Sequence, residues 1–164
     1  MVDTVCKQLD DLTLDYLQTF GHLLNLKLLL EQSMKNGYFS ISRSRVIMGV
    51  NQLSSLQFPD TIQPCTYIEF NEDEIEKHID EKQINTPLKW FGILTPQTLK
   101  QGQKYFLQSI DLALECIHVQ TKLERLKNNM HRLSKEKMIL IEDIKENIEP
   151  KSLIESVNEM KIEE

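Results

Sequence analysis

Apolar side chains recur in steps of three and four along residues 3–35, which predicts a long amphipathic helix. A second apolar stripe runs beside the first, so the helix is expected to be buried against more than one neighbour. Asn36 and Gly37 both tolerate the left-handed cap conformation and are predicted to end it. The stripes are Val5, Leu9, Leu12, Tyr16, Leu23, Leu26 and Leu30, then Leu17, Phe20, Leu24 and Leu28.

Residues 37–50 fit two local structures. In the stretch YFSISRSRVIMGV, apolar residues alternate partly with serines, which is typical of a short strand or an extended arm. A short helix over Ser42–Met48 fits the same residues. So few positions leave both predictions open.

Residues 51–86 have the composition of a variable polar connector. Between Asp60 and Lys82, eight acidic residues stand against two lysines, which is typical of a solvated segment. Within the connector, Cys65–Phe70 is predicted to form a strand and Glu72–Lys82 a short helix.

The stretch PLKWFGILTP, at 87–96, leads into a second long helix. Thr95 is a suitable N-cap and Pro96 suits the first helical position, so a helix is predicted over 97–149, ended by Pro150. Its apolar seam has the spacing of a coiled coil. The seam consists of Leu112, Cys116, Val119, Leu123, Leu126, Met130, Leu133, Lys137, Leu140 and Ile144.

These elements predict a mainly α fold, an antiparallel coiled-coil hairpin of two long helices with a small irregular or β element and an acidic connector between them. Residues 1–149 are expected to form one domain and 150–164 an acidic tail. Paired from the connector end, the first helix would cover the second only to about residue 130. The seam beyond that point then either frays or receives a helix from another chain. It comprises Leu133, Leu140, Ile144 and Ile148.

The composition excludes several classes of protein. A formal charge of −6 over 164 residues argues against a non-specific nucleic-acid binder. Nothing in the sequence reads as a membrane span, and early acidic residues argue against a signal peptide. Three widely separated cysteines, Cys6, Cys65 and Cys116, favour reduced thiols over a disulfide framework or a zinc site.

The sequence contains no recognisable catalytic or cofactor-binding set. The four histidines are scattered, and Cys116 and His118 are two apart, so they point away from each other on a helix. The acidic run Glu72–Glu76 lacks the glycine and spacing of an EF-hand loop. We therefore expect a protein that is not an enzyme and that has no cofactor and no metal site.

Two surfaces are candidates for binding. Trp90 and Phe91 either plug the end of the hairpin or belong to a partner interface, where tryptophan is over-represented. The long helix also carries a basic patch, which is either a solvated flank or a contact for lipid headgroups or an acidic partner. The basic patch consists of Lys122, Arg125, Lys127, Arg132 and Lys135, with Lys137 beside it.

Two motifs resemble those of a known family, the soluble coiled-coil assembly factors of the vacuolar-type proton ATPase. In that family a Pro-Leu, an aromatic pair with Gly, an aliphatic pair and a Pro precede a helix rich in Gln and Leu, as in PLKWFGILTPQTLKQGQ here. The family also has a Gly-aromatic-apolar-Ser element leading to Arg and then Met-Gly. NGYFSISRSRVIMG matches it through Gly37, Tyr38, Ser40, Arg45, Met48 and Gly49.

The resemblance implies a non-enzymatic assembly role. Members act at the endoplasmic reticulum membrane, peripheral on its cytosolic face and otherwise cytoplasmic, in a complex with a two-span membrane protein. Together they assist assembly of the membrane-embedded sector of the ATPase, which serves acidification of organelles. The partner-binding residues are then expected to be Trp90, Phe91, Ile93, Leu94, Tyr38, Arg45, Met48, Leu133, Leu140 and Ile144.

A prefoldin-like holdase subunit is the alternative, because helix, short β element and helix is also the outline of that family. Prefoldin subunits join paired β-hairpins into a multi-subunit barrel. A hexamer in solution would favour this alternative, and a monomer or heterodimer would favour the assembly factor.

Overall fold

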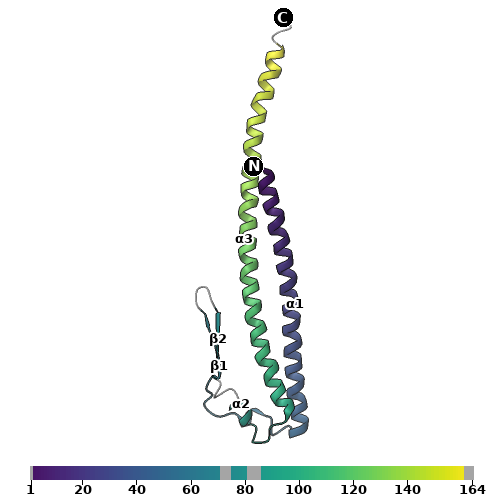
Figure 1. Ribbon diagram of the computed structural model, residues 1–164, viewed down its shortest axis with the longest axis vertical. Coiled ribbons are helices and arrows are strands. Elements are labelled where there is room, and N and C mark those ends of the chain that lie inside the picture. Colours follow the sequence, from purple (N-terminus) through teal and green to yellow (C-terminus); the bar gives the residue numbers. More distant parts are fainter. Residues whose placement is uncertain (1, 71–74, 81–85, 161–164) are drawn as a thin grey trace. The chain divides into compact units, whose positions relative to one another are not determined.

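The computed structural model describes residues 2–70, 75–80 and 86–160, with side chains except at positions 86 and 146–160 (Figure 1). Most of these residues are helical, which confirms the predicted mainly α class. The elements in chain order are α1 (Val2–Met48), a 3-10 turn η1 (Ser55–Gln57), β1 (Thr66–Phe70), β2 (Ile75–Ile79), α2 (Thr86–Lys89) and α3 (Gln97–Met160).

The chain forms two compact units, and α1 and α3 each contribute a segment to both. One unit comprises Met1–Leu23 with His118–Glu164, and the other comprises Leu24–Ile117. We call the second the central unit, because it contains the middle of the sequence. The expectation of one domain over 1–149 stays a prediction.

In the central unit, α1 and α3 are antiparallel and closely packed. The Ser33 hydroxyl donates to the Tyr105 carbonyl at 2.9 Å, and further along α1 the Ser44 hydroxyl lies 2.7 Å from that of Thr98. The partner residue number falls as the α1 number rises, as an antiparallel pair requires. Gly102 meets α1 between them, so small residues bring the two backbones together.

The predicted stop of the first helix at Asn36-Gly37 is wrong, because α1 continues to Met48. A Cβ built on Gly37 would lie 2.9 Å from the ring of Phe106, so this glycine makes room for an aromatic ring. The cap is provided instead by Gly49, at φ +93°, whose N–H donates to the Arg45 carbonyl at 3.0 Å. Of the two structures predicted for residues 37–50, the strand is wrong; Ser42–Met48 is helical, but as the last turns of α1 and not as a separate short helix.

The connector contains a β-hairpin. The predicted strand is confirmed as β1, which pairs antiparallel with β2 from Thr66 opposite Ile79 to Phe70 opposite Ile75. The helix predicted over Glu72–Lys82 is wrong where the structure describes it, because Ile75–Ile79 is a strand. Positions 72–74 and 81–82 lie outside the described residues.

Cross-strand contacts explain why this polar segment pairs as a strand. The rings of Tyr67 and His78 stack at a centroid distance of 5.0 Å. Lys77 forms an ion pair with Asp111 of α3, which ties the hairpin alongside that helix. Ile75 and Ile79 are four apart, which places them on one face of a strand and of a helix alike, so their spacing does not separate the two structures and the cross-strand contacts decide.

Helix α3 begins at Gln97, in agreement with the start predicted at Thr95-Pro96. The Pro96 carbonyl accepts hydrogen bonds from the N–H groups of Leu99 and Lys100. The end predicted at Pro150 is wrong, because the helix continues to Met160. A single proline removes one backbone donor and bends a helix, but flanking turns can continue on both sides of it.

In the other unit, the start of α1 packs on the later part of α3. The buried side chains are Val5, Thr19, Leu23, Leu123, Leu126 and Leu133. The burial of Leu133 corrects the expectation that cover ends near residue 130. The expected length of cover assumed a first helix that ends at residue 35. Helix α1 ends at Met48, so the helix is longer and can cover more of α3.

Within the described residues, no helix combines the length and the apolar character that crossing a bilayer requires.

Candidate functional site

The turn that follows α2 places the WFGIL residues, Trp90 to Leu94, in a fixed loop. The N–H of Phe91 donates to the Leu88 carbonyl at 3.3 Å, and that of Gly92 to the Lys89 carbonyl at 3.2 Å. Gly92 has φ +109°, a backbone conformation that only glycine adopts without strain. This glycine therefore reverses the chain and separates the aromatic pair from the aliphatic pair.

The aromatic pair packs inward on the connector. Trp90 and Phe91 both contact Phe58 edge to face, at centroid distances of 5.6 Å and 6.1 Å. Both side chains are half-buried. Of the two hypotheses for this pair, the plug at the end of the hairpin describes its packing in this structure.

The aliphatic pair points the other way. Ile93 is 100% exposed and Leu94 is 92% exposed, so neither side chain packs against the protein itself. Sequence reasoning grouped all four apolar residues into one cluster. The glycine that stands between the aromatic pair and the aliphatic pair was the signal in the sequence that could have separated the two pairs.

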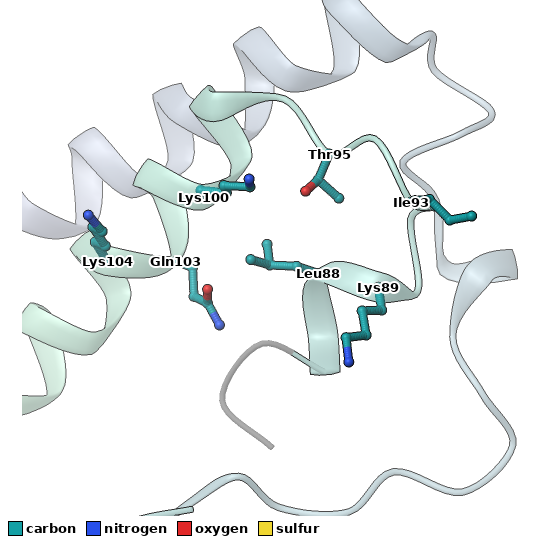
Figure 2. Close-up of a pocket in the computed structure, with 8 residues that line it drawn as sticks. Leu88, Lys89, Ile93, Thr95, Lys100, Gln103 and Lys104 are labelled. Carbon is teal, nitrogen blue, oxygen red and sulfur yellow. The ribbon is translucent and has the colours of Figure 1, made fainter. Parts of the chain in front are cut away.

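Two hollows lie beside this loop. The first, of about 480 Å³, is a largely apolar groove whose lining includes Trp90 and Phe91 together with Phe106 and Ile110 of α3. The second, of about 590 Å³, has three lysines in its lining, Lys89, Lys100 and Lys104. Figure 2 shows Leu88 reaching into this second hollow and Ile93 pointing away from it.

The second motif meets the first through α3. Tyr38 is mostly exposed, but its ring contacts that of Phe106 edge to face at 5.3 Å. Arg45 is exposed and Met48 is half-buried at the end of α1. The fully buried residue of this motif is Ser44, which the sequence comparison of motifs did not single out. A small residue at every third or fourth position of α1 was the available signal.

The predicted helical seam becomes progressively exposed. Leu133 is buried, Leu140 is half-buried and Ile144 is 46% exposed. Met138 and Ile139, which lie between them, are also exposed. Ile148 falls among the residues whose side chains the structure does not describe. The structure thus supports cover as far as Leu133 and gives an apolar surface on α3 after it.

The basic patch lies on the surface, and one of its members, Lys122, forms an ion pair. All five side chains are exposed, and the Lys122 ammonium lies 2.9 Å from the carboxylate of Asp15 on α1. The hydrogen bond from Lys122 is the main cause that lowers the pKa of Asp15 below its ordinary value of 3.8. Lys122 therefore helps to hold the helix pair together, whereas the other four members are left facing solvent.

The described residues contain no cluster of side chains that could hold a metal ion. The three cysteines are free and separate, and no three histidine, cysteine or carboxylate side chains of the described chain gather as a metal site requires. The features that stand out are apolar or basic surfaces, which are suited to binding.

Similar proteins were found by sequence comparison. The Vacuolar ATPase assembly protein VMA22 of Danio rerio is 25% identical, covering 79% of this chain and 90% of that protein. The proteins of the same name from Homo sapiens and Mus musculus are each 22% identical, covering 71% and 82% of this chain and 84% and 93% of those proteins. No family model matches the chain. The two motifs and these relatives together support the family of vacuolar-type proton ATPase assembly factors.

Proposed function

We propose that this protein is a non-catalytic assembly factor for the membrane-embedded sector of the vacuolar-type proton ATPase. The observation that carries the proposal is the similarity to proteins named Vacuolar ATPase assembly protein, over most of both chains. A fold of two long helices with apolar and basic surfaces is compatible with such a role, because it offers binding area along its length.

The protein acts in a heteromeric complex with a two-span membrane protein at the endoplasmic reticulum, and binds the unfinished sector transiently. It lies peripherally on the cytosolic face of that membrane. This partner assignment rests on the family resemblance. The exposed apolar surface of α3, from Met138 to Ile144, supports a partner helix at this place, because such a stripe is what a coiled-coil partner covers.

Affinity capture from intact cells tests the function. The tagged full-length protein is expected to recover membrane-sector subunits of the ATPase together with a small two-span membrane protein. Recovery of a prefoldin set in their place would refute the proposal. Acidification of organelles, measured with a pH-sensitive dye in cells lacking the protein, gives an independent readout.

The contribution of the helical seam is tested by charge insertion. The double variant Leu140→Asp with Ile144→Asp places two carboxylates in the proposed helix contact, so capture of the two-span partner should fall by roughly tenfold or more. The control is Asn129→Asp with Ser134→Asp, which adds the same two carboxylates at exposed positions of the same helix. Equal capture by both variants would remove this surface from the proposal.

The prefoldin-like alternative has one feature in its favour, since the connector does contain a β-hairpin. The relatives found do not favour it. Mass measurement on the purified protein separates the two, because a prefoldin-like subunit assembles into a hexamer through its hairpins, whereas the assembly factor is a monomer or heterodimer.

A further inference from the structure

In the central unit, aliphatic side chains protrude where α1 ends and α3 begins. Ile93 and Leu94 are 100% and 92% exposed, and Val46 and Leu56 are 86% and 88% exposed. Contacts bring their segments together, since Phe58 packs on Trp90 and, near Val46, the Ser44 hydroxyl of α1 lies 2.7 Å from that of Thr98. Single exposed aliphatic residues are common on proteins, but four that are this exposed at one end are typical of an interaction surface.

The same end is basic in an otherwise acidic protein. Residues 40–65 and 86–104 contain five basic residues and one acidic residue, Asp60, a formal charge of +4, whereas the whole chain carries −6. The basic residues are Arg43, Arg45, Lys89, Lys100 and Lys104.

Acidic residues of the central unit lie on the β1–β2 hairpin, away from the basic end. The hairpin strands lie along α3, tied by the Lys77–Asp111 ion pair, about four helical turns from Gln97. Its carboxylates, among them Glu69 and Glu76, therefore do not neutralise the basic end. The two charges are separated within one unit.

Three lysines lie in the hollow beside the exposed loop. Lys89, Lys100 and Lys104 line the hollow of about 590 Å³ whose rim includes Ile93 (Figure 2). Lysine is depleted from protein–protein interfaces, because its flexible stem is costly to immobilise. Aliphatic side chains flanked by lysines are instead the composition of segments that lie in a membrane interface, where the apolar tips enter the acyl boundary and the ammonium groups meet lipid phosphates.

We propose that this end of the protein docks directly on an anionic membrane surface, with Ile93 and Leu94 inserted and the three lysines on the headgroups. The contact goes beyond the proposed function, in which a membrane-spanning partner provides attachment. It does not require that function, so the two can fail separately. Gly92 and the packing of Trp90 on Phe58 hold the loop in its exposed position.

Vesicle flotation of the purified full-length protein tests the proposal without any other protein. Binding is expected to vesicles of phosphatidylcholine mixed with phosphatidylserine, and not to phosphatidylcholine alone. It should weaken as salt is raised, because screening reduces attraction between surface charges. Absence of binding to the anionic vesicles would overturn the proposal, and would leave the assembly function untouched.

Two variants locate the contact. Ile93→Ser with Leu94→Ser removes the apolar tips, and Lys89→Gln with Lys100→Gln and Lys104→Gln removes the charges; each should weaken binding by roughly tenfold or more. Circular dichroism confirms that each variant is folded.

Each variant has a matched control. Leu28→Ser with Leu29→Ser alters two exposed leucines of α1, and the charge control is Arg125→Gln with Arg132→Gln and Lys135→Gln on the basic patch. Both controls should bind as the unchanged protein does. If the basic-patch control loses binding as much as the loop variants, the membrane surface is assigned to the wrong part of the chain.

Trp90, the single tryptophan of the chain, lies in the same loop and reports on its surroundings through its fluorescence. Quenching of its emission by lipids brominated on their acyl chains is expected on binding to anionic vesicles. Binding without any quenching would contradict insertion at this loop.

Discussion

The hydroxyl oxygens of Ser44 and Thr98 lie 2.7 Å apart, and Ser44 is completely buried. This contact joins the last turns of α1 to the first turn of α3. The Ser44 hydroxyl also donates to the Ser40 carbonyl at 2.8 Å, so its hydrogen-bonding capacity is used within the helix pair. A side chain of two heavy atoms thus fixes the base of the two helices.

Replacing Ser44 with alanine should destabilise the protein. The change leaves the Thr98 hydroxyl without its buried partner, so the free energy of unfolding is expected to fall by about 1–2 kcal/mol. Ser42→Ala, at an exposed position of the same helix, should change it by less than about 0.5 kcal/mol. Urea unfolding followed by circular dichroism measures both. Equal effects would mean that the contact contributes nothing specific.

The two helical glycines Gly21 and Gly37 should respond oppositely to alanine. Gly21 has open space where a Cβ would be, so Gly21→Ala is expected to raise the free energy of unfolding by about 0.5–1 kcal/mol. At Gly37 the Cβ would meet the ring of Phe106, which also contacts Tyr38, so Gly37→Ala should lower it by about 1–3 kcal/mol. Thermal unfolding of the two variants tests the difference, and stabilisation by both would contradict the close approach at Gly37.

Removing Phe58 should expose Trp90. In Phe58→Ala the ring that supports Trp90 and Phe91 is lost, so the tryptophan emission is expected to move to longer wavelength as water reaches the indole. Phe39→Ala removes a mostly exposed ring from α1 and should leave the emission unchanged. An unshifted spectrum in Phe58→Ala would mean that the indole packs on something else.

The Asp15–Lys122 ion pair should make stability depend on acid. Because the folded-state pKa of Asp15 is lowered from 3.8, its contribution is present above that pH and is lost as the pH falls through the lower folded-state value. Asp15→Asn should therefore flatten the midpoint of thermal unfolding against pH in this acid range, by a small amount because the pair is partly exposed. Asp11→Asn, at an exposed position nearby, serves as the control and should keep the slope. Identical slopes for both variants would contradict the pairing.

Periodicity predicted the long helices and their antiparallel pairing, because an apolar stripe over 30 residues has few other ways to be buried. It misjudged boundaries where tertiary packing competes with local preference. Gly37 looked like a cap, but the approach of Phe106 requires a residue without a side chain at that position. Local sequence carries no information about which residue of α3 lies opposite.

The candidate site was predicted as a set of residues but not as an arrangement. Trp90 and Ile93 are three apart in the sequence and were expected to act together. The positive φ of Gly92 between them reverses the chain, so one packs inward and the other is fully exposed. Composition alone does not reveal the basic end, because its charge of +4 is the sum over residues 40–65 and 86–104, two segments that only the fold brings together.

The close packing of α1 on α3 implies that two sets of positions tolerate substitution differently. At Ser33, Gly37 and Ser44 any enlargement disturbs the helix pair, so a screen for protein abundance should be depleted of bulky residues there. At Ile93 and Leu94 the fold is indifferent to the side chain, so the same screen should tolerate polar residues. A mutational library can be scored once for protein abundance and once for activity. Positions at which substitutions reduce activity but not abundance would then map the binding surface of the protein directly.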